Sequence, residues 1–358
     1  MPLMLYLRSS LLPMIVASMI ACGGSAPPAN APAAGASGAR TTVTGAGATF
    51  PYPIYSKWFD EYHKRHGDVE INYQSIGSGG GIRQMLAGTV DFGASDVPMT
   101  DEQLGQAKTK ILHFPTVLGA VVPTYNIAGV TQELKFTPAA LAGIFLGTIK
   151  KWNDPGIAGP NPGVALPAAD IVVVHRSEAS GTTFVWTDYL GKVSDAWKSK
   201  VGANAAVNWP VGLGGKGNEG VSGLLKQTPN AIGYVELIYA VQNKLGYGSV
   251  QNSSGAFVKA DLASVTAAAA AAATSMPDDF RVSITNPGGA AAYPIASFTW
   301  LLVPAQLPDA TKGKTIVDFL KWILADGQSM AAPLSYAPLP KEVVAKEQQA
   351  IAQIHAGS

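Results

Sequence analysis

Hydrophobic and polar positions along the chain repeat one local unit: a β-favouring run, a glycine-rich turn and an amphipathic helix. In the first unit the run covers residues 41–44, the turn covers 45–50 and the helix opens at Pro51, a residue suited to a first helical turn. The apolar residues that follow recur at helical spacing, at Ile54, Tyr55, Trp58, Phe59 and Tyr62. This pattern predicts a strand followed by a helix with one buried face.

The same unit recurs downstream. A β-favouring run at 69–73 leads into a glycine-rich turn at 75–81 and a helix that stops near Gly88. A short strand is predicted at 90–94, and it ends just before Asp96. Strand and helix thus alternate again within about thirty residues, as in βαβ units.

The second half of the chain continues the alternation. Strands are predicted at 171–174, where four β-branched residues indicate burial on both faces, and at 231–235 and 297–303. Helices are predicted at the alanine-rich residues 263–273 and at 315–324. Alternating strands and helices predict an α/β protein with mainly parallel sheets. A length of 358 residues predicts about two domains.

Composition removes several classes of function. Hydrophobic residues make up 47% and charged residues 14%, which predicts a largely folded chain. Lys and Arg together number 25 against 24 Asp and Glu, so there is no bulk charge to attract nucleic acid. Any bound anion must be held by local groups. One cysteine excludes an internal disulfide and a Cys-rich metal site, and no metal or cofactor is expected.

The N-terminus is typical of an exported protein. Residues 1–21 contain a basic residue and an apolar stretch of signal-peptide length. Cys22 follows directly, as in a bacterial lipobox, where that cysteine is lipidated; the alternative is a plain secretory signal with an incidental cysteine. Residues 22–40 are rich in Gly, Ser, Ala and Pro and predict a flexible tether. We expect an exported lipoprotein, periplasmic or at the cell surface, that is held to a membrane through its lipid alone.

Three strand-to-helix turns carry hydroxyl groups: Thr49 in the first, Ser78 in the second, and Ser180 with Thr182 in the third. In open α/β sheets ligands bind beyond the carboxyl ends of the strands, where backbone N–H groups and helix N-termini favour anions. Arg176 precedes the third turn, and Asp96 is an acceptor at the end of the short strand. Many donors and one acceptor suit a tetrahedral oxyanion that still carries a proton.

At these turns the chain resembles the phosphate-binding proteins of Pst ABC transporters. The resemblance spans nearly all of residues 42–340 in order. It is carried by the runs TGAGATFP at 44–51, IGSGG at 76–80, DFGASD at 91–96, FPTV at 114–117, KWND at 151–154, Arg176 with Ser180-Gly181-Thr182, GLGGKG at 212–217 and GYVE at 233–236.

The resemblance implies phosphate contacts, by motif position, and a non-enzymatic role. The implied contacts are Thr49, Phe50 through its backbone N–H, Ser78, Asp96, Arg176, Ser180, Gly181 and Thr182. Relatives commonly have Asp two residues after the Arg. Here Glu178 is one methylene longer, so its pairing with Arg176 is left open.

The resemblance also implies a two-lobed periplasmic-binding-protein fold of type II, with a mainly parallel sheet flanked by helices in each lobe. The strand at 297–303 returns after the elements of the second lobe. We therefore place lobe I at 41–122 plus 294–358 and lobe II at 123–293.

The expected role is high-affinity binding of inorganic phosphate and its delivery, by a monomer, to an inner-membrane ABC permease. One alternative is a phosphomonoester hydrolase that uses the same anion pocket, although the sequence shows no evident nucleophile–base pair. The other is a receptor for a different oxyanion such as sulfate or molybdate. Asp96 argues against both of these anions, because neither carries a proton near neutral pH.

Lipidation of Cys22 can be tested by substitution. If the lipid is the membrane anchor, Cys22→Ala releases the protein in soluble form, because the tether has no other group to hold a membrane. Fractionation of cells that express each form checks this. Equal recovery of both forms with membranes would contradict lipid anchoring.

Overall fold

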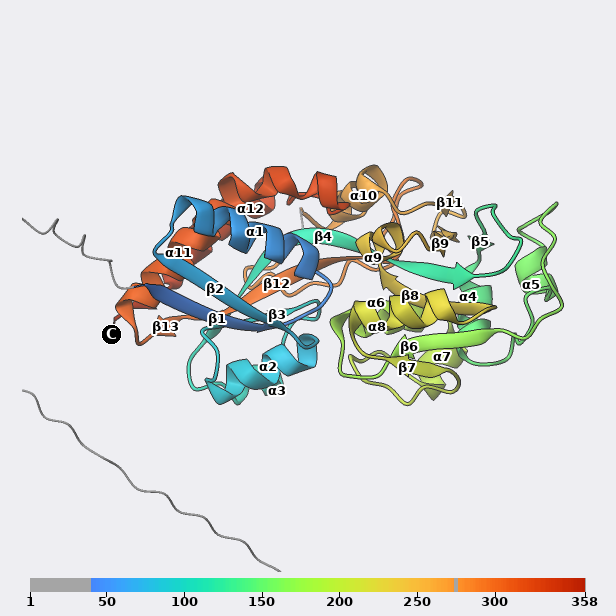
Figure 1. The fold of residues 1–358 in the computed structure, drawn as a ribbon, viewed down its shortest axis with the longest axis horizontal. Helices are drawn as coiled ribbons and strands as arrows, with labels where there is room; N and C mark the ends of the chain where they lie inside the picture. Colours follow the sequence, from blue (N-terminus) through green and yellow to red (C-terminus); the bar gives the residue numbers. More distant parts are fainter. Residues whose placement is uncertain (1–39, 274–275, 358) are drawn as a thin grey trace, which may run out of the picture. The chain divides into compact units, whose positions relative to one another are not determined.

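The computed structural model describes residues 40–273 and 276–357, and Figure 1 shows their fold. The signal peptide and nearly all of the tether predicted before Arg40 lie outside the described residues. Within them, a nine-stranded sheet has the order β2-β1-β3-β12-β4-β8-β6-β7, and β9 pairs with β4 at the side. These strands are β1 (Thr41–Gly47), β2 (Val69–Ser75), β3 (Phe92–Ser95), β4 (Ile111–Asn126), β6 (Val172–Arg176), β7 (Leu213–Gly215), β8 (Ala231–Glu236), β9 (Gly246–Tyr247) and β12 (Ala296–Pro304).

Helices flank this sheet, and short strands form two small additional sheets. The helices are α1 (Tyr52–Arg65), α2 (Ser78–Ala87), α3 (Asp101–Gly105), α4 (Pro138–Phe145), α5 (Pro155–Ala158), α6 (Gly181–Val193), α7 (Asp195–Lys200), α8 (Gly217–Gln227), α9 (Leu237–Gln242), α10 (Leu262–Ala273), α11 (Ala310–Ala325) and α12 (Lys341–Ala350). The small sheets contain β5 (Lys135–Phe136), β10 (Ser249–Gln251) and β11 (Phe257–Val258), and β13 (Gln306–Leu307) with β14 (His355–Ala356). None of the helices in the described ranges has the length and apolar composition needed to cross a membrane.

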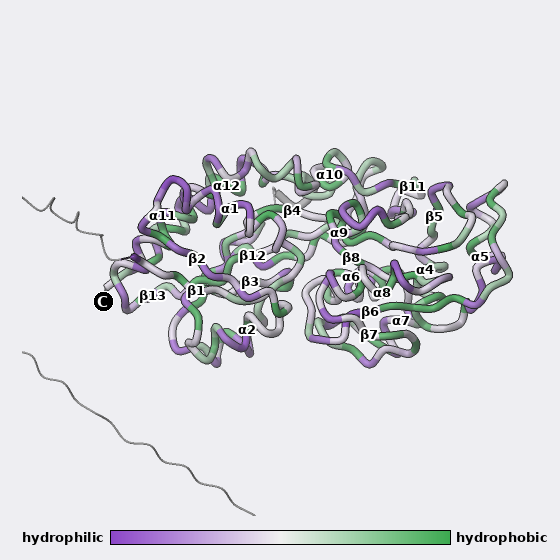
Figure 2. The backbone as a smooth tube through the Cα atoms, in the orientation of Figure 1, coloured by the Kyte–Doolittle hydropathy of each residue, from purple (hydrophilic) through white to green (hydrophobic). Residues whose placement is uncertain are grey.

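The repeated units predicted from the sequence are confirmed. In α1 the residues Ile54, Tyr55, Trp58 and Tyr62 are buried, as their spacing predicted. Helix α2 ends at Ala87 and is capped by Gly88, which adopts the left-handed conformation that glycine tolerates best. The alanine-rich segment forms α10. Figure 2 colours the backbone by hydropathy: α4 and β6 are largely hydrophobic, whereas α12 is largely hydrophilic.

Strand β4 is the main element that the sequence did not predict. It is 16 residues long and buried along nearly all of its length. Pro115 and Pro123 lie inside it, and proline in a sequence normally argues against a central strand because it lacks an N–H group. The structure accommodates Pro115 at an irregularity in the pairing of β4 with β12. The register shifts there between Thr299 and Trp300.

Strand direction refines the expectation of parallel sheets. β1 pairs in parallel with β2 and β3, and β6 pairs in parallel with β7 and β8. The two long strands between these groups are antiparallel: β12 to β3 and β4, and β4 to β8. The fold is therefore two α/β lobes, each with parallel outer strands, joined through antiparallel β4 and β12.

The lobe boundaries stay predictions. The first, at 122/123, falls inside β4, where Val122 pairs with Val235 of β8. The second, at 293/294, falls just before β12 begins. Each predicted boundary thus lies in or beside one of the two strands that connect the groups.

Close packing of α2 on the sheet gives a testable stability difference between two helical glycines. A Cβ at Gly81 would lie 2.6 Å from Ala46 O and 2.8 Å from Ala94 O, whereas a Cβ at Gly223 in α8 meets nothing within 4 Å. We expect Gly81→Ala to lower the free energy of unfolding by about 1–3 kcal/mol through overpacking. Gly223→Ala should raise it by up to about 1 kcal/mol through helix propensity. Urea unfolding of both variants checks this; equal effects would contradict the packing argument.

Candidate functional site

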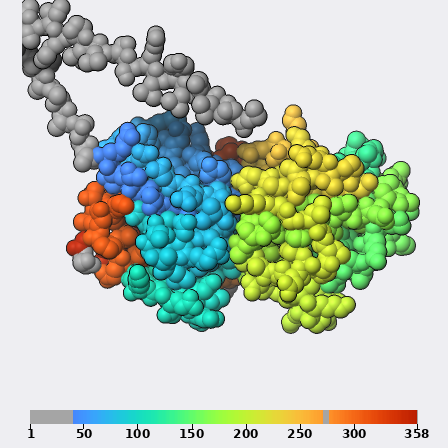
Figure 3. All heavy atoms as spheres, turned by 60° about the horizontal axis from the view of Figure 1, so that its bottom comes forward, coloured from blue at the N-terminus to red at the C-terminus, as the bar shows by residue number. Residues whose placement is uncertain are grey.

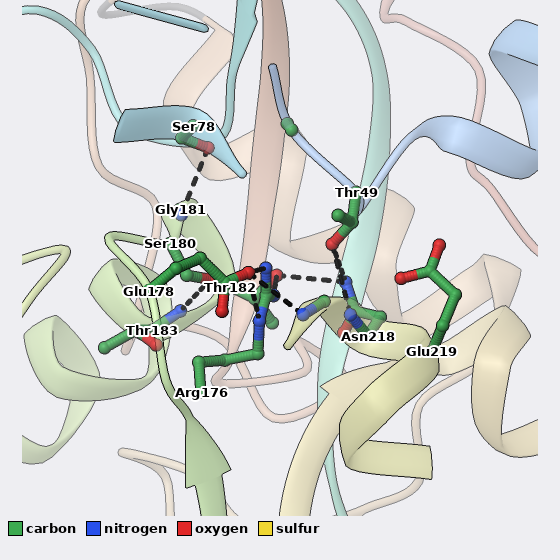
Figure 4. A network of polar contacts seen from close by, with 12 residues as sticks. Thr49, Ser78, Arg176, Glu178, Ser180, Gly181, Thr182, Thr183, Asn218 and Glu219 are labelled. Carbon is green, nitrogen blue, oxygen red and sulfur yellow. Dashed lines mark hydrogen bonds and ion pairs between the residues drawn. The ribbon is translucent and has the colours of Figure 1, made fainter. Parts of the chain in front are cut away.

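Polar residues from several strand ends and helix starts converge between the two groups of strands (Figure 4). Thr49 follows β1, Ser78 opens α2, Asp96 follows β3, and Thr182 lies in the first turn of α6. Asn218 lies in the first turn of α8. All five side chains are at least 98% buried. In Figure 3 the blue and cyan atoms of the N-terminal elements meet the yellow and yellow-green atoms of the later ones.

Ser78 joins α2 to α6. Its Oγ accepts a hydrogen bond from the backbone N–H of Gly181 at 3.1 Å and another from the backbone N–H of Asp96 at 3.1 Å. Its own proton points to Asp96 Oδ2 at 3.4 Å. A Cβ at Gly181 would lie 2.5 Å from Ser78 Oγ and 2.6 Å from Asp96 Oδ2, so only glycine permits this approach.

Thr49 makes a second bridge between the two groups of strands. Its Oγ1 accepts hydrogen bonds from Asn218, from Nδ2 at 2.9 Å and from the backbone N–H at 3.3 Å. Its carbonyl accepts from Tyr239 Oη at 2.6 Å. The turn after β1 is thereby fixed against α8 and α9.

Arg176 is held from both sides. Its Nε donates to Glu178 Oε1 at 3.0 Å, and Nη2 forms an ion pair with the same oxygen. Its Nη1 donates to Thr182 Oγ1 at 3.1 Å, which directs the remaining edge of the guanidinium into the network. The pairing with Glu178 that the sequence left open is therefore present.

Glu178 is partly buried and also accepts the backbone N–H of Gly217 at 3.0 Å. Burial raises its pKa, but the charge of Arg176 and these hydrogen bonds outweigh burial, so the pKa lies below its usual value. Glu178 is thus ionised near neutral pH and balances the buried guanidinium charge.

Asp96 is the acceptor at the centre of the network. Its carboxyl is 1% exposed, and Thr299 Oγ1 donates to its Oδ1 at 2.8 Å. Burial raises its pKa to about 7, although hydrogen bonds from Thr299 and Ser78 and the charge of Arg176 act in the opposite direction. The group therefore exchanges a proton near neutral pH.

Two further predicted site residues have other hydrogen-bond partners. Ser180 is the N-cap of α6, where its Oγ accepts the backbone N–H of Thr183 at 3.2 Å. The ring of Phe50 is buried, and its carbonyl accepts from Tyr336 Oη at 2.6 Å. The structure thus brings the eight predicted residues to one region, and their contacts with a ligand stay predictions.

Sequence reasoning missed three contributors to the network: Asn218, Tyr239 and Thr299. Asn218 could have been found, because it follows a glycine-rich turn at a helix start, as Ser78 and Thr182 do. Tyr239 and Thr299 carry no such signal, since each reaches the site only through the pairing of distant elements.

The arrangement suits a small anion. The N-termini of α2, α6 and α8 face the region and supply positive potential. Hydroxyl, amide and guanidinium groups supply donors, and Asp96 supplies an acceptor. Among residues 40–273 and 276–357, no group of three or more His, Cys, Asp or Glu side chains is placed to hold a metal ion.

Known proteins resemble this chain over most of its length. A family model described as a PBP superfamily domain matches residues 32–326. The phosphate-binding protein PstS of Pasteurella multocida (strain Pm70) is 49% identical over 310 residues, covering 86% of this chain and 89% of that protein. PstS of Methanocaldococcus jannaschii is 39% identical over 354 residues, covering 92% and 90%.

Solved structures share the fold. A high affinity periplasmic phosphate-binding protein solved with bound phosphate has a TM-score of 0.70 and 23% identity, covering 86% of this chain and 93% of that one. A phosphate-binding protein from Stenotrophomonas maltophilia has a TM-score of 0.67 and 19% identity, covering 87% and 94%. The resemblance inferred from the sequence motifs is confirmed: the chain belongs to the PBP superfamily and, within it, to the PstS family of phosphate-binding proteins.

Proposed function

We propose that the chain binds inorganic phosphate between its two lobes and delivers it to an inner-membrane ABC permease, without catalysing a reaction. The observation that carries this proposal is the buried carboxyl of Asp96 among hydroxyl, amide and guanidinium donors. The names of the relatives, which describe phosphate binding, support it. They give no support to the hydrolase alternative.

Asp96 supplies selectivity. A carboxylate aimed at an anion is repulsive unless a proton lies between them. Phosphate near neutral pH carries one or two protons, so it donates a hydrogen bond to Asp96, whereas sulfate has no proton to share. Sites built around a ligand hydrogen bond reject an analogue that lacks it.

The other groups supply the donors. Arg176 offers the guanidinium edge that Glu178 leaves open, and such a planar fork matches an oxyanion in two charge-assisted hydrogen bonds. We assign further contacts to the hydroxyls of Thr49, Ser78, Ser180 and Thr182 and to the backbone N–H groups of Phe50 and Gly181. In this arrangement the hydroxyls exchange some of their present partners for phosphate oxygens.

Lobe closure accompanies binding in this proposal. We place lobe I at 41–122 plus 294–358 and lobe II at 123–293. The hydrogen bonds Gly181–Ser78, Asn218–Thr49 and Tyr239–Thr49 join residues of the two segments. These contacts support a closed state in which both lobes touch one anion. We further propose that a monomer works at a membrane surface, held there by a lipid on Cys22.

The role of Asp96 can be tested by comparing the binding of phosphate with that of sulfate. Wild-type protein should prefer phosphate and arsenate to sulfate by roughly 10⁴-fold at pH 8. Asp96→Asn removes the repulsion and supplies an amide that can donate to sulfate, so the preference should narrow mainly through better sulfate binding. Calorimetric titration measures both affinities. If the wild-type protein binds phosphate and sulfate equally well, or if Asp96→Asn leaves the ratio of the two affinities unchanged, then Asp96 is not the acceptor that discriminates between them.

The guanidinium fork gives a second prediction. Arg176→Lys keeps the charge but loses the fork and should weaken phosphate binding about ten- to a hundredfold, while Arg176→Ala should weaken it more. Because the alanine variant leaves Glu178 as an unpaired anion, Arg176→Ala combined with Glu178→Gln is the matched control. Titration of all three checks the order. Wild-type affinity in the double variant would show that Arg176 does not bind the ligand.

A further inference from the structure

The buried carboxyl of Asp96 has two oxygens in different surroundings. Oδ1 accepts the hydroxyl of Thr299 at 2.8 Å, while Oδ2 lies on the side of Ser78 and Gly181. Thr299 Oγ1 has a second acceptor, Ser95 O, at 3.5 Å, so distance assigns its proton to Asp96. A carboxyl group with one oxygen held in this way presents the other oxygen to the site.

Thr299 reaches Asp96 because of strand register. Trp300 of β12 pairs with Ser95 of β3, and the next position along this antiparallel pair places Thr299 opposite Asp96. On the other side of β12, Thr299 pairs with Val117 and Trp300 pairs with Pro115, so Thr116 is an extra residue in β4. Such a bulge re-aims side chains, and bulges are common beside functional sites.

The bulge also fixes the backbone of Thr299. Thr116 Oγ1 donates to the carbonyl of Thr299 at 3.2 Å, and Tyr55 Oη lies 2.9 Å from Thr116 Oγ1. Since the Thr116 proton is used, Tyr55 is the donor in that contact. Tyr55, Thr116 and Thr299 are each at most 1% exposed, so no water competes for these bonds.

We propose that Thr299 is a positioning and specificity-determining residue that, without touching the ligand, holds Asp96 as an oriented, ionised acceptor. This inference rests on the proposed binding of phosphate. A neutral Asp96 would be a donor, and a donor fits sulfate as well as phosphate. The hydroxyl of Thr299 stabilises the ionised form and so maintains discrimination against sulfate above about pH 7.

Other groups act on the same carboxyl. The hydrogen bond from Thr299 lowers the pKa of Asp96, as do Arg176 and Ser78, against the larger effect of burial. The remaining titratable groups that interact electrostatically with Asp96 are Tyr55 of α1, Tyr73 of β2, Glu236 at the end of β8 and Tyr336. Burial raises the pKa of each of these four. The groups that favour the ionised form of Asp96 are Thr299, Arg176 and Ser78.

The test compares variants that differ in one hydroxyl. Thr299→Val keeps the shape and removes the donor; Thr299→Ser and Thr299→Ala both lose the methyl group but differ in the donor. Thr124→Val, on β4, removes an equally buried hydroxyl that bonds Val122 O and does not reach Asp96. Phosphate and sulfate affinities are measured for each by calorimetry between pH 6 and 8.5, after thermal unfolding has shown that each variant is folded.

In wild-type protein we expect sulfate binding to strengthen as pH falls through about 7, because Asp96 then gains its proton. Loss of the Thr299 donor raises the pKa of Asp96. In Thr299→Val and Thr299→Ala, sulfate binding should therefore begin to strengthen at a higher pH than in the wild-type protein. At pH 8 their phosphate-to-sulfate ratio should fall about tenfold or more. Thr299→Ser and Thr124→Val should keep the wild-type ratio and profile.

The outcomes separate the two claims. Suppose that the wild-type protein prefers phosphate but Thr299→Val and Thr299→Ala keep its phosphate-to-sulfate affinity ratio and its pH profile. The role proposed for Thr299 is then wrong, while the proposal of phosphate binding stands. If Thr299→Ser and Thr299→Ala change the ratio equally, the methyl group matters rather than the donor, and the inference fails. If wild-type protein does not bind phosphate, the proposed function fails and takes this inference with it.

Discussion

Burial of the Asp96 carboxyl is the constraint on which the site depends. A buried carboxyl without partners is costly and becomes protonated, which would make it a donor. Thr299, Ser78 and the charge of Arg176 oppose this, and the resulting pKa of about 7 reflects the balance. Each of these groups comes from a different element, so the acceptor exists only when β3, β12, α2 and β6 are assembled.

The sheet supplies this assembly through strand direction. Parallel strands on either side bring the turns after β1, β3 and β6 and the starts of α2 and α6 toward one region. The antiparallel strands β4 and β12 run between the two groups and bind both. Because β4 and β12 are hydrogen-bonded to each other and to both groups of strands, their register fixes where side chains lie at the site. The bulge at Thr116 is an example, since it sets the position of Thr299 beside Asp96.

Polar contacts join the two halves at the candidate site. Hydrogen bonds from Gly181 to Ser78 and from Asn218 and Tyr239 to Thr49 each contribute about 1 kcal/mol. In the closed state proposed above, interactions of this size would help to hold the lobes together without making that state permanent. A bound anion that adds charge-assisted hydrogen bonds from both sides would favour closure, and its release would allow opening.

The sequence by itself determined the α/β class, the repeated strand–turn–helix units and the family, because glycine turns, helical periodicity and short motifs are local signals. It also marked eight residues that the structure brings to one region. Strand β4, the antiparallel centre of the sheet and the partners Asn218, Tyr239 and Thr299 were not predicted. Proline inside β4 hid the strand, and those three partners reach the site only through contacts between distant segments. Local sequence shows which groups can bind an anion, whereas register and packing decide which oxygen of Asp96 accepts the hydroxyl of Thr299, because that depends on residues about two hundred positions apart.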